Sequence, residues 1–203
     1  MKKIILSFVL IFSLLMSFSA CNNGGSKDDK TPEETVYSVL DRLAKNDYSE
    51  IELTTTVKNG DIELTAKYVL TDTSVTYVVE QMSMLPVDGV LDNVSATDKI
   101  VLSGTATVKD GTVLTLDGAS VNMPEYDELK GAFNFKEDYF SNVKEDSGKF
   151  SADVISPADF LGTTKVLANL KVEVEYNSNA ITKLTLVYKT ANSTVTTVYL
   201  FKK

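Results

Sequence analysis

The sequence predicts a mainly β domain of the α+β class, in which a curved antiparallel sheet or half-barrel carries one N-terminal amphipathic helix and short helical turns. Apolar and polar residues alternate through most segments after Ser49, which is the period of a half-buried strand. Turn sequences such as Asn59-Gly60 and Asp110-Gly111 separate these segments. Apolar residues recur at helical spacing in one longer stretch only, before the first strand.

The first twenty residues have the composition of a secretory signal peptide. Lys2 and Lys3 precede an apolar run that ends at Phe18, and small residues accompany its end. The run is about 15 residues long, whereas a helix that crosses a bilayer needs roughly 20. Residues 1–20 are therefore interpreted as a cleaved export signal, and a retained transmembrane helix is not expected.

The signal ends in Phe18-Ser19-Ala20-Cys21, which resembles the lipobox of bacterial lipoproteins. The resemblance implies cleavage before Cys21, acylation of that cysteine (palmitate among the chains) and attachment to the extracytoplasmic face of the cell membrane. Phe18 departs from the family, which more often has Leu there. Cys21 is the only cysteine and has no intramolecular disulfide partner. The alternative is an ordinary signal peptide with a chance cysteine.

Residues 21–31 are interpreted as the lipidated cysteine and a flexible tether, because residues 22–30 contain no apolar side chain. Residues 32–203 have the length of a single domain. The signal contains two lysines and no acid, so the rest of the chain has a net charge of −10, against −8 for the whole sequence. This charge excludes nucleic acid as a partner. Without a polybasic patch, contact with the membrane is expected through Cys21 alone.

The N-terminal helix is expected to begin at Thr31-Pro32, which combines a capping residue with a proline at the first helical position. It should continue for about 14 residues, to Asn46. Its apolar stripe consists of Val36, Val39, Leu40 and Leu43. Such a helix must bury this stripe, and the following segments predict a sheet that can cover it.

The first predicted strands cover residues 51–57, 62–70 and 74–84. The third has apolar residues in both phases, so we expect it to be covered on both faces. Glu80 lies inside it, and a carboxylate in such a place needs a partner or a shifted pKa. Glu80 is a candidate ligand-binding residue. The alternative is an edge position, a lysine partner or exposure to solvent.

The rest of the chain predicts a continued meander. A loop is expected over 86–99, strands over 100–108 and 112–116, and a less regular stretch over 123–148 with a helical turn at 124–129. A strand over 149–155 then leads into a helical turn that begins at Ser156-Pro157 and ends at Gly162. The last predicted strands cover 171–176, 181–189 and 194–201.

Most side chains that carry catalysis are absent. There is no histidine, and the one cysteine is assigned to lipid, which excludes serine–histidine and cysteine–histidine nucleophiles and histidine-ligated zinc. Ser141 and Lys144 match the Ser-x-x-Lys pattern of penicillin-binding enzymes, but its companion motifs are missing. An acid-catalysed hydrolase remains as a third alternative. The protein is not expected to be an enzyme, and no catalytic residue, metal or cofactor is predicted.

Five tyrosines share the apolar phase of their strands: Tyr68, Tyr77, Tyr176, Tyr188 and Tyr199. Such a face either packs as core or lines a cavity for an apolar ligand, since binding sites combine apolar walls with few polar groups. Tyr68, Tyr77, Tyr188 and Tyr199 are candidate ligand-binding residues together with Glu80. Core packing is the alternative.

The chain resembles the LolA/LppX-type lipoprotein carriers in its order of lipobox, tether, amphipathic helix, antiparallel meander and late helical turn. The match of order and spacing covers residues 32–203. The resemblance implies an incomplete β-barrel with helices on its concave face and the carriage of lipids or lipoproteins between membranes. The arginine of that family's cavity has no equivalent, because Arg42 lies on the polar side of the helix. We expect a lipid-anchored envelope protein that binds a hydrophobic or amphipathic ligand. The alternative is a non-catalytic structural or protein-interaction domain.

Overall fold

The computed structural model describes residues 35–86, 94–107, 113–116, 119–122, 126–129, 131–162, 167–190 and 192–203. The predicted signal peptide, Cys21 and the tether lie outside these residues. Within the described ranges, no helix is both long and apolar enough to cross a bilayer.

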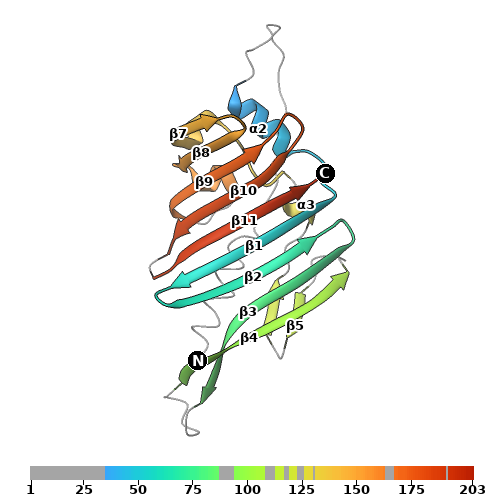
Figure 1. Cartoon of the computed structure of the whole chain (residues 1–203), viewed down its shortest axis with the longest axis vertical. Coiled ribbons are helices and arrows are strands. Elements are labelled where there is room, and N and C mark those ends of the chain that lie inside the picture. Colours follow the sequence, from blue (N-terminus) through green and yellow to red (C-terminus); the bar gives the residue numbers. More distant parts are fainter. Residues whose placement is uncertain are drawn as a thin grey trace.

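Nine strands form one open antiparallel sheet, which confirms the mainly β prediction (Figure 1). They are β1 (Glu50–Asn59), β2 (Ile62–Leu70), β3 (Ser74–Pro86), β4 (Val94–Thr107), β7 (Phe140–Asp146), β8 (Lys149–Val154), β9 (Ala168–Tyr176), β10 (Ile181–Lys189) and β11 (Thr194–Lys202). Their order across the sheet is β4-β3-β2-β1-β11-β10-β9-β8-β7. A separate hairpin pairs β5 (Val113–Leu116) with β6 (Ala119–Asn122).

The first and last strands pair at the centre of the sheet. β1 and β11 run antiparallel in unbroken register from Glu50 opposite Lys202 to Lys58 opposite Thr194. β4 and β7 consequently form opposite edges, and the chain between them has to pass from one edge to the other. Part of this connection crosses a face of the sheet, because Phe133 packs against Tyr199 of β11 with ring centroids 5.1 Å apart.

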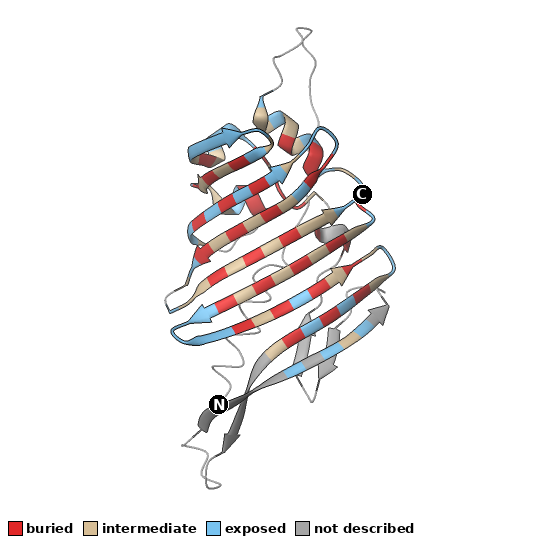
Figure 2. Ribbon diagram, viewed as in Figure 1, coloured by how far each residue is buried: buried red, intermediate tan, exposed pale blue. Residues whose placement is uncertain are grey.

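The two faces of the sheet differ in burial, as the stripes along each strand in Figure 2 show. The face that carries Leu53, Tyr68 and Tyr199 is buried, and we call it the inner face. The opposite, outer face carries exposed or half-buried residues such as Thr76 and Lys171. Alternate residues therefore point into the core and toward solvent, which is the pattern of a sheet covered on one side.

Short helices contribute to the cover of the inner face. They are α2 (Val36–Ala44), α3 (Tyr126–Leu129), the 3-10 turn η1 (Glu137–Tyr139) and α4 (Pro157–Leu161). The helices α2 and α4 bury Leu40, Leu43, Phe160 and Leu161 almost completely, and all four belong to the core that the inner face forms. Of the helical turns predicted at 124–129 and 156–162, the first is found as α3 and the second as α4, and Gly162 ends α4 in the left-handed conformation, as expected.

Helix α2 begins later than the sequence predicts. Thr35 has extended backbone angles, and its hydroxyl accepts a hydrogen bond from the Ser38 N–H at 3.3 Å, so Thr35 is the N-cap. The helix is nine residues long, shorter than the expected 14. The predicted cap at Thr31 lies outside the described residues. Arg42 is exposed, as its place on the polar side of the helix predicts.

Two hairpin turns use residues with positive φ. Gly60 follows Asn59 with φ of +58°, and Asn59 pairs with Ile62, so the predicted Asn-Gly hairpin is confirmed. Ser147 and Gly148, with φ of +42° and +83°, form the two-residue turn between β7 and β8. Positive φ at both central positions is the requirement of the turn that matches the twist of paired strands.

Further local predictions are wrong. The strand at 74–84 was expected to be covered on both faces, but Thr76 and Val78 are exposed on the outer face of β3. The expected loop at 86–99 contains the first residues of β4, and its residues 87–93 lie outside the described ranges. Residues 113–116 do not continue the meander, because β5 pairs with β6 in a second sheet. Side-chain alternation specifies a strand but not its partner.

Candidate functional site

The structure brings the four candidate tyrosines onto the inner face. Tyr77 of β3 lies opposite Tyr68 of β2, which lies opposite Leu53 of β1, which in turn lies opposite Tyr199 of β11. Tyr188 of β10 lies further along the sheet, opposite Val195. The side chains of Tyr68, Tyr188 and Tyr199 are at most 1% exposed, and that of Tyr77 is 7% exposed.

Glu80 does not join this group. Val79 is buried on the inner face, and the half-buried Glu80 belongs to the other phase of β3. Its Oε2 accepts a hydrogen bond from the backbone N–H of Thr65 at 2.9 Å. The register of β2 and β3 extends as far as Ala66 opposite Val79, so the carboxylate takes the place of a backbone acceptor just beyond the ladder. The Glu80 carboxylate is therefore hydrogen-bonded at the point where β2 and β3 separate.

Two threonines that sequence reasoning missed lie among the tyrosines. Thr55 of β1 and Thr197 of β11 are opposite each other, completely buried, with their hydroxyl oxygens 3.3 Å apart. Both occupy the apolar phase of a strand, and this position is the sequence signal from which their burial could have been predicted. We call Thr55, Thr197, Tyr188 and Tyr199 the hydroxyl cluster. Its four members lie on the neighbouring strands β1, β11 and β10.

The phenol groups of the cluster are buried without partners. In the part of the chain that the structure describes, neither Tyr188 nor Tyr199 has a hydrogen-bond partner for its hydroxyl. Burial raises the pKa of Tyr188 to about 12. Burial also raises the pKa of Tyr199, and the proximity of Tyr188 raises it further. Both groups therefore remain protonated near neutral pH, with a donor and an acceptor each.

A chain of aromatic side chains leads from Tyr199 into the cover. Phe133 packs edge-to-face on Tyr199, and Phe160 of α4 packs on Phe133 with centroids 5.8 Å apart. Phe160 in turn contacts Phe135 and Phe140 at 5.4 and 5.2 Å. Among the described residues, the only buried non-apolar side chains besides the tyrosines are the two threonines, and none is charged. The interior is thus apolar apart from a few neutral hydroxyls.

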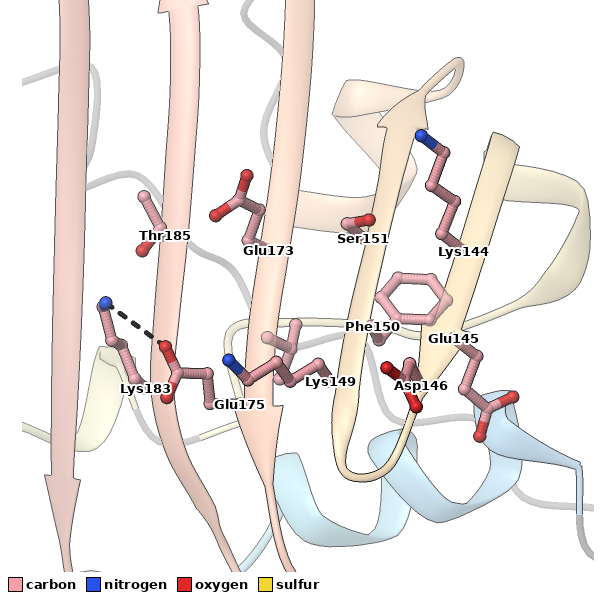
Figure 3. Close-up of a pocket in the computed structure, with 11 residues that line it drawn as sticks. Lys144, Glu145, Asp146, Lys149, Phe150, Ser151, Glu173, Glu175, Lys183 and Thr185 are labelled. Carbon is pink, nitrogen blue, oxygen red and sulfur yellow. Dashed lines mark hydrogen bonds and ion pairs between the residues drawn. The ribbon is translucent and has the colours of Figure 1, made fainter.

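A hollow of about 240 Å³ lies on the outer face, over β7 to β10 (Figure 3). None of the candidate tyrosines lines it. Its charged lining residues are Lys144, Glu145, Asp146, Lys149, Glu173, Glu175 and Lys183. Lys183 forms an ion pair with Glu175 at 3.3 Å. Within the described ranges, no group of three acidic residues is placed to hold a metal ion. Charges of both signs on an open surface are typical of solvated side chains rather than of a specific site.

No protein-family model matches the chain, and no curated protein matches its sequence.

Proposed function

We propose that this protein is a lipid-anchored protein of the bacterial cell envelope whose domain binds a hydrophobic or amphipathic ligand. The anchor is Cys21, on the extracytoplasmic face of the membrane, and residues 22–31 form the tether. The ligand binds against the inner face of a curved sheet, of the half-barrel kind. No catalytic step, metal or cofactor is part of the proposal.

One observation carries the ligand site: the inner face combines an apolar, aromatic surface with buried hydroxyls that have unused hydrogen-bonding capacity. Ligand sites are mostly apolar, with a small number of polar groups that orient the ligand. The cover suits entry of a ligand, since it consists of short helices and connecting segments. The backbone ladder joins the strands to one another and not to the cover, so separation of the cover breaks no hydrogen bond of the ladder.

The ligand can be sought in the chain from residue 22 onward, purified without detergent. This shortened chain keeps every residue that the structure describes, because the described residues begin at Thr35. Native mass spectrometry should show a stoichiometric adduct of lipid size, and organic extraction should identify its class. A clean mass that stays unchanged after incubation with envelope lipids would contradict ligand binding.

The anchor is tested by replacing its acceptor. The substitution Cys21→Ala in the full chain should move the protein from the membrane fraction to the soluble fraction of the envelope. A Ser19→Ala variant keeps the cysteine and a small residue before it, and should remain in the membrane fraction. If the Cys21→Ala protein stays membrane-bound, attachment through lipid on this residue is excluded.

A second candidate function has support on the outer face. Val78 of β3 and Val101 of the edge strand β4 are 43% and 57% exposed. β4 is 14 residues long, and a long edge strand can pair with a strand of another protein. A protein-interaction domain is therefore the alternative if no ligand is found. Cross-linking from position 101 in the envelope would then identify the partner.

A further inference from the structure

The hydroxyl cluster lies in the middle of the sheet rather than at its margin. Thr55 and Thr197 pair across β1 and the central strand β11, and Tyr199 is two residues further along β11 on the same face. Side chains at this spacing are neighbours on one face of a strand. Tyr188 lies on the adjacent strand β10, opposite Val195, which is two residues from Thr197. Four hydroxyls thus lie on three neighbouring strands near the middle of the inner face, among apolar side chains.

Tyr48 is a buried tyrosine of the same protein whose hydroxyl does have hydrogen-bond partners. The hydroxyl of Tyr48 donates a hydrogen bond to the carbonyl oxygen of Leu43 at 2.8 Å and accepts one from the N–H of Ile181 at 3.2 Å. Tyr48 is 4% exposed, so its burial is similar to that of Tyr188 and Tyr199. Those two phenols have no such partners among the described residues. Buried hydroxyls normally have partners in protein, water or ligand.

The charge of the interior restricts what could bind there. The described core contains no buried lysine, arginine, aspartate or glutamate. An ionised head group would lose its hydration without gaining a counterion, and burial of an unpaired charge is strongly unfavourable. A neutral hydroxyl or carbonyl faces no such penalty, since protonated phenols can donate to it or accept from it.

We infer that the hydroxyl cluster is the polar subsite of the proposed ligand site, and that it binds the uncharged polar group, a hydroxyl or an ester carbonyl, of an otherwise apolar molecule. This inference rests on the proposed ligand binding and adds the ligand class. The neutral group lies at Tyr188 and Tyr199 and near the threonine pair, and the apolar chain lies between the inner face and its aromatic cover. Neutral lipids fit this description, whereas ionised fatty acids and anionic phospholipids do not.

Three probes of equal chain length test the inference: decane, 1-decanol and decanoate. Their binding to the chain from residue 22 onward is measured by displacement of a fluorescent apolar dye at about pH 8, where a carboxylate with an ordinary pKa is ionised. The wild-type protein should bind 1-decanol more than tenfold more tightly than decanoate. Equal affinity, or a preference for decanoate, would overturn the neutral subsite.

The double variant Tyr188→Phe/Tyr199→Phe isolates the hydroxyls. Its affinity for 1-decanol should fall about five- to tenfold, the size expected of one neutral hydrogen bond, and its affinity for decane should not change. The matched control is Tyr48→Phe, which removes a hydroxyl outside the cluster and should leave both affinities unchanged. If 1-decanol binds the double variant as well as the wild type, the cluster is not the subsite.

The results distinguish failure of the polar subsite from failure of ligand binding itself. Binding of decane and 1-decanol, unaffected by the double variant, would leave an apolar ligand site and remove the polar subsite. Failure of all three probes to displace the dye would overturn the proposed ligand binding, and the subsite with it.

Discussion

At the scale of single residues, the hydroxyl of Tyr48 is expected to contribute to stability because it takes part in two hydrogen bonds, with Leu43 and Ile181. The backbone carbonyl of Tyr48 also accepts a hydrogen bond from the Tyr126 hydroxyl of α3, so this residue joins α2, β10 and α3. Tyr48→Phe should lower the free energy of unfolding by about 1–2 kcal/mol, measured by urea denaturation. An unchanged denaturation midpoint would show that solvent replaces both bonds.

Tyr199 should behave in the opposite way. Its hydroxyl is fully buried with no partner among the described residues, so the folded protein bears the cost of removing it from water. Tyr199→Phe keeps the ring that packs on Phe133, and should leave the stability of the ligand-free protein unchanged or raise it by up to about 1 kcal/mol. A loss similar to that of Tyr48→Phe would mean that the Tyr199 hydroxyl is bonded in solution.

At the scale of elements, the turn between β7 and β8 depends on Gly148. Its φ is +83°, and a Cβ at this position would lie 2.5 Å from the carbonyl oxygen of Tyr176. The backbone N–H of Tyr176 also donates a hydrogen bond to the Gly148 carbonyl oxygen at 2.8 Å, which holds the two backbone segments close together. Gly148→Ala should therefore destabilise the protein by about 2 kcal/mol or more, from the strain of positive φ and the steric contact.

The matched control for that substitution is Gly60, which occupies the turn between β1 and β2. Its φ is +58°, but a Cβ there would meet no atom within 4 Å. Gly60→Ala should cost about 1 kcal/mol, the strain of positive φ alone. Thermal unfolding of both variants gives the comparison. Equal losses would show that the contact with Tyr176 relaxes easily.

Helix α2 depends on its N-cap. The Thr35 hydroxyl accepts a hydrogen bond from the Ser38 N–H, and its carbonyl accepts one from the Ser38 hydroxyl at 2.8 Å. Thr35→Ala should cost about 1 kcal/mol of stability, whereas Thr35→Ser should cost little, because serine is also a good cap. Chemical denaturation of the two variants separates capping from loss of the methyl group. Equal losses in both would assign the effect to packing.

Local signals in the sequence predicted the hairpins but not every partner. β10 is found at 181–189 as predicted, because its alternation is regular and asparagine-rich turns border it. β7 was missed because only Phe140 is buried in it and the remaining residues are exposed or half-buried, so no alternation is visible. A register shift between Ser141 and Lys144, with Asn142 at positive φ, further breaks the pattern.

At the scale of the whole molecule, the pairing of β1 with β11 could not be predicted, because it joins segments about 140 residues apart and no local turn specifies it. The candidate site was predictable only in part, for the same reason. The tyrosines were found from the phase of their strands, since phase is local. The contact between Thr55 and Thr197 depends on the pairing of those two strands and is visible only in the structure.

Alkaline titration tests the integrity of this whole interior. The folded pKa of Tyr188 is about 12, and burial also raises the pKa of Tyr68 and Tyr199 above the unfolded value near 10. Between these values the folded protein holds protons that the unfolded chain has lost. The contribution of these groups to stability is therefore complete below about pH 10 and should fall as the pH rises toward 12.

Buried tyrosines should ionise only as the protein unfolds, so the rise in tyrosinate absorbance and the loss of circular dichroism should coincide. Tyr188→Phe should flatten the fall. If all nine tyrosines of the chain ionise near pH 10 while the fold persists, water reaches the inner face, and Tyr68, Tyr188 and Tyr199 are not buried in solution.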